Sequence, residues 1–320
     1  MLPEHPAGVL LAVVTTGGTI AATRGGDGAL VPSLGPSELL ADLLAGAVPG
    51  VRVRAAEALR ADSSTLSLAD AARVRAAVAR ALADPAVAGA VVLHGTDSME
   101  ESAYLLDLHH DDERPVVLTG AQRAADAAEP DGPGNVVLAA RTALDPASRG
   151  RGVLVAFGGR VHRAAGLSKR HTEDLDAFSS PAPPLPRPDP LPWTGRPWPR
   201  VDVVAVVPGG DAVLLDAAVA AGARGVVLQA LGSGNAGADV VAGVRRCTAA
   251  GVAVVVTTRV PEGPVSAGYG GGGGGHDLAA AGAVGAGRLR AGQARVLLAS
   301  LLRGDALGAG DVAAQFAARG

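Results

Sequence analysis

Several residue types that specialised protein classes need are scarce in this 320-residue chain. Aromatic residues make up 2%, the formal net charge is −3, and no block of Lys and Arg occurs, which argues against a nucleic-acid surface. The single cysteine, Cys247, excludes a disulfide framework and a cysteine-based metal site, and is best read as a small buried apolar side chain. No apolar stretch reaches the roughly 20 uncharged residues of a membrane span. We therefore expect a cytoplasmic protein with no nucleic-acid or membrane partner, acting on a small molecule.

Motifs of common enzyme classes are missing as well. The turn Thr16-Gly-Gly-Thr-Ile-Ala21 is not a G-x-G-x-x-G dinucleotide fingerprint, and no G-x-x-x-x-G-K-[ST] phosphate loop occurs. Neither a G-x-S-x-G elbow nor an H-E-x-x-H pair is present, so serine-esterase and zinc-hydrolase interpretations lose their usual support.

Lysine is present only once, at Lys169, and the other 27 Lys or Arg positions are arginine. A guanidinium does not lose its proton in a protein, whereas a buried ammonium can. Lys169 is therefore a candidate base. On composition alone, a surface lysine left by chance is an equally good interpretation.

Short β-branched runs alternate with alanine-rich amphipathic segments, which is typical of βα units on a largely parallel sheet. The sequence predicts strands at 9–15, 51–58, 89–93, 115–119, 152–157, 201–207, 225–229 and 252–257. It predicts helices at 37–44, 68–83, 99–108 and 134–144, among others.

Nine prolines between Pro181 and Pro199 cannot lie inside a sheet, so 181–199 is predicted to be an extended linker. Two α/β domains follow from this break, an N-terminal one over 1–180 and a C-terminal one over 200–320. The six glycines of 270–275 follow Tyr269, and a mobile surface loop is their simplest interpretation.

Polar residues gather where the predicted strands end, which is where an open α/β sheet forms its ligand crevice. Thr15-Thr-Gly-Gly-Thr-Ile-Ala21 follows the first strand, and its glycines let the chain bring the Thr19 hydroxyl close to a ligand. His94-Gly-Thr-Asp-Ser-Met-Glu-Glu101 follows the third strand. Helix capping alone would explain the hydroxyl and carboxylate residues of this second segment. Capping does not explain Thr19.

These two segments resemble the active-site signatures of the bacterial-type L-asparaginase family, in the same order and at a similar separation. The resemblance runs from the first strand to the last helix. Further blocks that resemble the family are Val117 to Arg123, Asp131-Gly-Pro133 with Asn135, Lys169 to Phe178, and Gly232-Ser-Gly-Asn235.

The resemblance implies roles for individual residues. Thr19 matches the threonine taken as the nucleophile. Thr96, Asp97 and Lys169 match a second group, in which the lysine polarises the Thr96 hydroxyl and the aspartate binds the α-ammonium of the substrate. Ser63 matches the serine that binds the α-carboxylate, although a turn before the next helix would explain the residue types there equally well. The other candidate substrate-binding residues are Asp62, Gly95, Ala121 and Asn235.

The resemblance also implies a larger N-terminal parallel-sheet domain and a smaller Rossmann-like C-terminal domain. The reaction implied is hydrolysis of L-asparagine to L-aspartate and ammonia, with glutaminase as a side activity to test and with no metal or cofactor. Either Thr19 forms an acyl-enzyme or Thr96 activates water directly, and we favour the covalent route.

Two departures from the family bear on the site. The segment 23–32, which we expect to close over the substrate as a lid, lacks the tyrosine that the family often places there. Tyr269 stands where exported members contribute a glutamate from the neighbouring subunit. Asn235 matches an asparagine that acts across the subunit interface, which implies a homotetramer built as a dimer of dimers.

Two alternatives stay open. The chain could be the asparaginase-like, ammonia-releasing subunit of an amidotransferase, although it carries no added N-terminal domain. It could instead be a catalytically silent amino-acid sensor on the same fold. Retention of Thr19, Thr96, Asp97 and Lys169 together argues for the enzyme.

Overall fold

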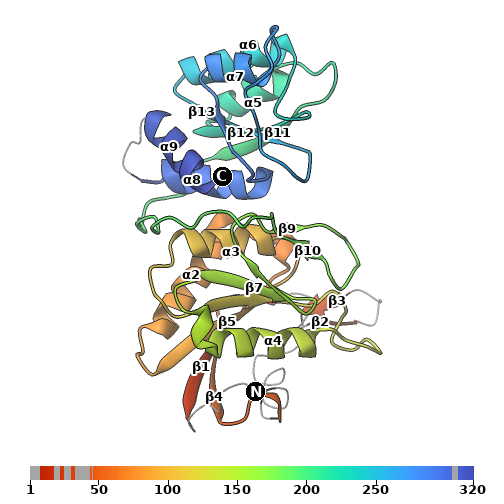
Figure 1. Cartoon of the computed structure of the whole chain (residues 1–320), viewed down its shortest axis with the longest axis vertical. Coiled ribbons are helices and arrows are strands. Elements are labelled where there is room, and N and C mark those ends of the chain that lie inside the picture. Colours follow the sequence, from red (N-terminus) through yellow and green to blue (C-terminus); the bar gives the residue numbers. More distant parts are fainter. Residues whose placement is uncertain (1–7, 18–21, 25–29, 33–43, 45, 305–308) are drawn as a thin grey trace. The chain divides into compact units, whose positions relative to one another are not determined.

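The computed structural model describes residues 8–17, 22–24, 30–32, 44, 46–304 and 309–320. Thr19 and most of the helix predicted at 37–44 lie outside these residues. The chain divides into two compact units, Met1–Ser180 and Pro181–Gly320. Each unit is an α/β sandwich with its own sheet (Figure 1). No helix among the described residues is long and apolar enough to cross a membrane.

The first unit is built on a six-stranded sheet in the order β4-β1-β5-β6-β7-β8. Its first five strands run parallel, and β8 pairs antiparallel with β7. Strands β1, β5, β6 and β7 are nearly continuous runs of buried aliphatic residues, as expected where helices cover both faces of a parallel sheet. The strands are β1 Val9–Thr15, β4 Val51–Glu57, β5 Val87–Leu93, β6 Val116–Thr119, β7 Val153–Phe157 and β8 Arg160–Arg163.

Three helices cover this sheet: α2 (Leu68–Leu82), α3 (Met99–Leu108) and α4 (Gly132–Leu144). Figure 1 shows α3 and α4 on opposite faces of the sheet, with α2 beside α3. Because side chains alternate along a strand, Leu11 and Val13 of β1 point into the core that α4 completes with residues such as Ala140. Helix α2 begins with a capping box between Ser67 and Asp70.

The fold class is confirmed, and the predicted strands and the helices predicted at 68–83, 99–108 and 134–144 agree with the structure to within about two residues. Met99–Leu108 and Val9–Thr15 coincide with their predicted bounds. The sequence did not predict β8, which has four residues, or the antiparallel pair β9 (Ser168–Lys169) and β10 (Phe178–Ser179), because strands this short carry too little periodicity to be recognised. Within the lid predicted at 23–32, the described ends form the antiparallel pair β2 (Ala22–Arg24) and β3 (Leu30–Pro32).

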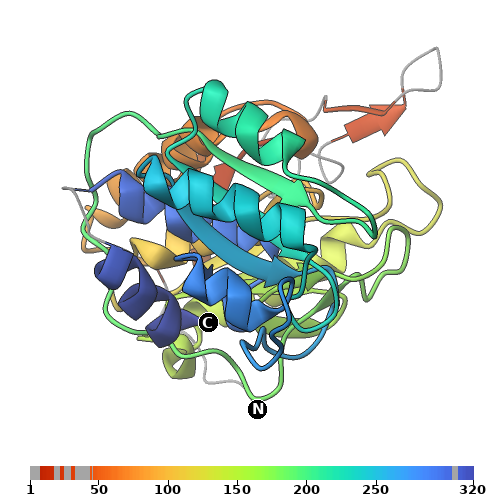
Figure 2. The ribbon, with the colours of Figure 1, turned by 90° about the horizontal axis from the view of Figure 1, so that it is seen from above.

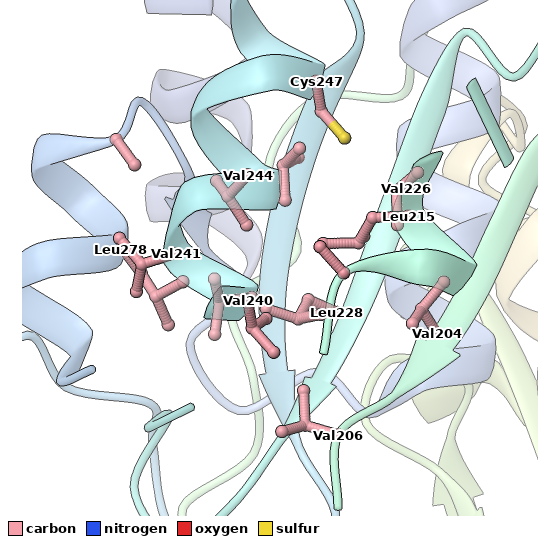
Figure 3. Packing of buried hydrophobic residues seen from close by; sticks show 14 of the residues in the cluster. Val204, Val206, Leu215, Val226, Leu228, Val240, Val241, Val244, Cys247 and Leu278 are labelled. Carbon is pink, nitrogen blue, oxygen red and sulfur yellow. The ribbon is translucent and has the colours of Figure 1, made fainter. Parts of the chain in front are cut away.

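The second unit has a four-stranded parallel sheet in the order β11-β12-β13-β14. Helices α5 and α6 lie side by side over one face (Figure 2), while α8 packs against the other face. Figure 3 shows the core on the α5 and α6 side, where Leu215 of α5 and Val244 of α6 lie in one buried cluster with Leu228 of β12. The elements are β11 Val201–Ala205, β12 Gly225–Ala230, β13 Ala253–Thr258, β14 Val284–Gly285, α5 Val213–Ala220, α6 Ala238–Ala249, α7 Gly275–Ala280, α8 Ala291–Leu302 and α9 Ala309–Arg319.

Cys247 lies fully buried in this core, which confirms its interpretation as a small apolar side chain (Figure 3). Burial raises the pKa of its thiol, since the thiolate would be desolvated there. Cys247 is therefore unsuited to nucleophilic chemistry.

The proline-rich segment 181–199 forms neither helix nor strand, because proline donates no backbone hydrogen bond. It belongs to the second unit, where its two tryptophans enclose the guanidinium of Arg303, the residue that follows α8. The Arg303 guanidinium carbon lies 4.4 Å from the ring centre of Trp193 and 4.2 Å from that of Trp198. Stacking of this kind anchors the segment to α8.

The glycine run 270–275 differs from the loose surface loop that its composition suggested. The Asp277 carboxylate accepts hydrogen bonds from the N–H groups of Gly272 (2.8 Å) and Gly274 (2.9 Å). A Cβ on Gly274 would lie 1.9 Å from the carbonyl oxygen of Tyr269. Gly273 to Gly275 thus form a tightly packed turn that leads into α7, where glycine is required for the close backbone approach, while Gly270 and Gly271 are exposed.

Candidate active site

The carboxyl ends of the parallel strands bring the polar segments of the first unit to one edge of its sheet. After β1, the Thr16 hydroxyl donates a hydrogen bond to the carbonyl of Leu93 at the end of β5 (3.1 Å). Gly17 follows with φ +94°, and a Cβ there would lie 2.8 Å from the carbonyl oxygen of Ala61. These contacts anchor the chain just before Thr19, which itself lies outside the described residues.

Ser63 joins the segment after β4 to the segment after β5. Its buried hydroxyl oxygen accepts a hydrogen bond from the backbone N–H of Asp97 (3.1 Å), and its carbonyl accepts one from the Ser98 hydroxyl (2.6 Å). Ser63 also begins a 3-10 turn, Ser63–Thr65, so it takes part both in a turn and in the hydrogen bonds to Asp97 and Ser98. The neighbouring Asp62 is exposed, and its side chain makes no cap to that turn.

Lys169 reaches the Thr96 and Asp97 side chains from β9. Its Nζ donates hydrogen bonds to Thr96 Oγ1 and to Asp97 Oδ1, each at 2.8 Å. The lysine side chain is 20% exposed and the aspartate side chain 58% exposed, so the ammonium is largely enclosed while the carboxylate stays open to a ligand. The only lysine of the chain is therefore no chance surface residue.

Helix capping does not account for the residues that precede α3. Ser98 occupies the N-cap position of α3 but makes no side-chain capping hydrogen bond. Thr96 and Asp97 instead bind Lys169, 73 and 72 positions away in the sequence. The capping interpretation of this segment is wrong, and its polar side chains serve a long-range cluster.

Glu100, in the first turn of α3, holds the main chain of Lys169 in place. The backbone N–H of Lys169 donates to Glu100 Oε2 at 2.7 Å. Burial raises the pKa of the Glu100 carboxyl to about 7, and the charge of Glu101 adds to this effect. The backbone bond from Lys169, the Ser168 hydroxyl and the charge of Lys169 act in the opposite direction. The sequence-based interpretation did not single out Glu100, although its place two residues after Ser98 could have suggested it.

His94 directly follows β5, two residues before Thr96. Its fully buried ring places Nδ1 2.6 Å from the carbonyl oxygen of Gly95. Because a carbonyl only accepts hydrogen bonds, the ring proton lies on Nδ1. Burial lowers the pKa of His94, because the charged ring would be desolvated there, so the neutral ring is favoured.

The remaining predicted residues fall in two places. Gly95 and Ala121 are buried at the ends of β5 and β6, close in sequence to the cluster. Asn235 belongs to the second unit, where its Oδ1 accepts a hydrogen bond from the N–H of Gly275 (3.1 Å). Tyr269, in the same unit, is 65% exposed. Among the described residues, no three His, Cys, Asp or Glu side chains come together as a metal site would require.

The first unit thus brings together a threonine, a carboxylate and a lysine, residue types from which hydrolytic sites with an activated hydroxyl are built. Residues 10–188 match the family model described as "Asparaginase, N-terminal", and residues 200–314 match "Glutaminase/Asparaginase C-terminal domain". The chain belongs to the asparaginase family, as its motifs predicted.

Known relatives cover nearly the whole chain. It is 32% identical over 308 residues to an L-asparaginase of Bacillus licheniformis, which covers 91% of this chain and 95% of that protein. It is 39% identical over 234 residues to a probable L-asparaginase of Deinococcus radiodurans, covering 66% and 70% of the two chains. The crystal structure of a probable cytoplasmic L-asparaginase from Campylobacter jejuni matches with a TM-score of 0.79 and 27% identity, over 97% of this chain and 99% of that one.

Proposed function

We propose that the protein is an L-asparaginase, which hydrolyses L-asparagine to L-aspartate and ammonia. The observation that carries the proposal is the contact of Lys169 Nζ with both Thr96 and Asp97 at 2.8 Å. The relative from Bacillus licheniformis, described as an L-asparaginase, and that from Deinococcus radiodurans, described as a probable L-asparaginase, support it.

The substrate is a zwitterion, and the cluster offers a group for each of its ends. The exposed carboxylate of Asp97 would bind the α-ammonium by a charge-assisted hydrogen bond. The Ser63 hydroxyl already accepts a bond from the Asp97 N–H, so its proton can be donated to the α-carboxylate. The buried position of Ser63 would make this contact stronger than it would be in bulk water.

Chemistry would begin with attack of the Thr19 hydroxyl on the side-chain amide carbon of the substrate. Collapse of the tetrahedral intermediate expels ammonia and leaves an acyl-enzyme ester, which water then hydrolyses to L-aspartate and free Thr19. Thr96 and Lys169 would handle the protons of these two steps, because they are the hydroxyl and the amine that lie in contact.

Ammonia release by the purified chain tests this function. We expect ammonia from L-asparagine, a smaller yield from L-glutamine, and loss of both in Thr96→Val, which removes only the hydroxyl. A chain that binds L-aspartate but releases no ammonia would support a silent sensor instead. Release that needs an added amidotransferase partner would support the ammonia-supplying subunit.

We also propose a homotetramer that acts in the cytoplasm. Exposed apolar side chains in the second unit, Val203, Val207, Val213 and Leu214, offer a surface for subunit contact. The description of the Campylobacter jejuni protein as cytoplasmic supports the location. Light scattering after gel filtration measures the assembly, and cell fractionation measures the location.

A further inference from the structure

Gln122, just after β6, contacts the same hydroxyl as Lys169. Its Oε1 lies 3.2 Å from Thr96 Oγ1, while its Nε2 lies 3.1 Å from the carbonyl oxygen of Thr172 and 3.2 Å from that of Asp174. Carbonyl oxygens only accept hydrogen bonds, so the amide NH₂ must face Thr172 and Asp174. The orientation of the amide follows, and Oε1 faces Thr96.

This orientation decides where the Thr96 proton lies. Gln122 Oε1 can only accept, so the single hydroxyl proton of Thr96 is donated to it. The oxygen of Thr96 then presents its lone pairs to the Lys169 ammonium, which donates at 2.8 Å. The Thr96 proton therefore points away from Lys169 in this arrangement.

The backbone of Gln122 is held rigidly enough to serve this purpose. Its N–H, and that of Arg123 at 2.9 Å, donate to the Asp131 carboxylate, which also accepts from Asn135 Nδ2 at 3.1 Å. The buried Asn135 in turn bonds the carbonyl of Gly120 (3.0 Å). Polar networks with every partner satisfied restrain the groups they contain.

We propose that Gln122 is a positioning residue that holds the Thr96 hydroxyl with its proton pointing away from Lys169. Through Thr96, Gln122 thereby influences whether the Lys169 amine is protonated. The effect on catalysis rests on the proposed function, but the link between Gln122, Thr96 and the protonation of Lys169 does not depend on it. With the acceptor removed, the Thr96 hydroxyl can turn and donate to a neutral Lys169 amine, which favours the neutral form.

The single lysine makes this coupling directly measurable. Protein labelled with ¹³C and ¹⁵N only in lysine gives one lysine side-chain NMR signal, from Lys169, whose pH titration can be followed without any turnover. In Gln122→Met, which keeps the side-chain length but removes the acceptor, we expect the titration midpoint to fall relative to the parent. Gln122→Glu adds a charge and should raise the midpoint, which shows that the probe responds. The carboxylates that face the ammonium, Asp97 and Glu100, are the same in every variant.

A double-mutant cycle separates positioning from a structural brace. In a Thr96→Val background, Gln122→Met should no longer move the Lys169 titration, because the hydroxyl that carries the coupling is gone. An unchanged midpoint in Gln122→Met alone, or an equal shift with and without the Thr96 hydroxyl, overturns the proposal. A brace for 172–174 would lower Tm equally in the Met and Glu variants and leave the midpoint of the Met variant unmoved.

Turnover gives a second readout. In Gln122→Met we expect kcat for L-asparagine to change about tenfold, because the Thr96 hydroxyl is no longer held in one orientation toward Lys169, with KM within about twofold. If the parent releases no ammonia while the NMR cycle behaves as expected, the proposed function fails and the coupling stands. A rise in KM with unchanged kcat would contradict the positioning role.

Discussion

Replacing Lys169 by arginine keeps the positive charge of the side chain but removes its ability to release a proton. The Lys169 ammonium contacts Thr96 Oγ1 and Asp97 Oδ1 at 2.8 Å each and is 20% exposed, so it occupies a small and nearly enclosed space. A planar guanidinium can still pair with the half-exposed Asp97, but it does not reproduce the compact ammonium beside Thr96.

The expected loss is in kcat. General acid–base catalysis typically contributes factors of about 10² to 10⁴, so we expect kcat for L-asparagine to fall by about 100-fold or more. A 100-fold loss corresponds to about 2.7 kcal/mol of transition-state stabilisation. Stability should change little, because the bond from the Lys169 N–H to Glu100 and the pairing of β9 with β10 are made by the main chain. The ion pair with Asp97 is open to water on the side of the carboxylate, which is 58% exposed, and pairs that water reaches contribute only about 0–1 kcal/mol.

Steady-state kinetics and thermal unfolding of Lys169→Arg test this reasoning together. The matched control is the reverse change, Arg246→Lys, at an exposed ion pair with Asp216 (2.7 Å) in the second unit. This variant should keep kcat and Tm near those of the parent. If Lys169→Arg also retains parental kcat, the lysine is not the proton-handling group. A large fall in Tm would instead show that its role is structural.

Three further changes test other parts of the molecule. Thr19→Ala should abolish turnover with Tm unchanged; activity within a few-fold of the parent would remove Thr19 as nucleophile. The pKa of the Glu100 carboxyl is raised from 4.5 to about 7 in the folded chain, so the unfolded chain loses this proton at lower pH. The free energy of unfolding therefore falls as pH rises from 4.5 to 7, by roughly 3 kcal/mol at most. Glu100→Gln should therefore gain Tm relative to the parent at pH 8 and not at pH 4.5, and a pH-independent difference would contradict this. Gly274→Ala should cost ~2 kcal/mol or more in denaturant unfolding, because its Cβ would lie 1.9 Å from the Tyr269 carbonyl oxygen. Gly270→Ala, whose Cβ would meet its nearest neighbour at 4.0 Å, is the matched control and should be nearly neutral.

The sequence by itself determined the α/β class and the positions of the main strands. Runs such as Val9–Thr15 are continuously aliphatic because helices cover both faces of a parallel strand, so the pattern is local and readable. The sequence also placed Thr96 and Asp97 at a strand end, and the rarity of lysine drew attention to Lys169. These predictions succeed because each depends on the residues of one segment.

The tertiary structure alone decided which side chains meet. Glu100 and Gln122 lie in two of the motif blocks but received no role from the sequence, yet one binds the backbone N–H of Lys169 and the other accepts a hydrogen bond from the Thr96 hydroxyl. The short strands β9 and β10 and the close packing of the glycine run were likewise missed. Partners separated by 26 to 73 positions come within 3.2 Å only after the parallel sheet has brought its strand ends to one edge. No local pattern encodes such a distance, because the loops that set it are held by contacts with distant parts of the chain.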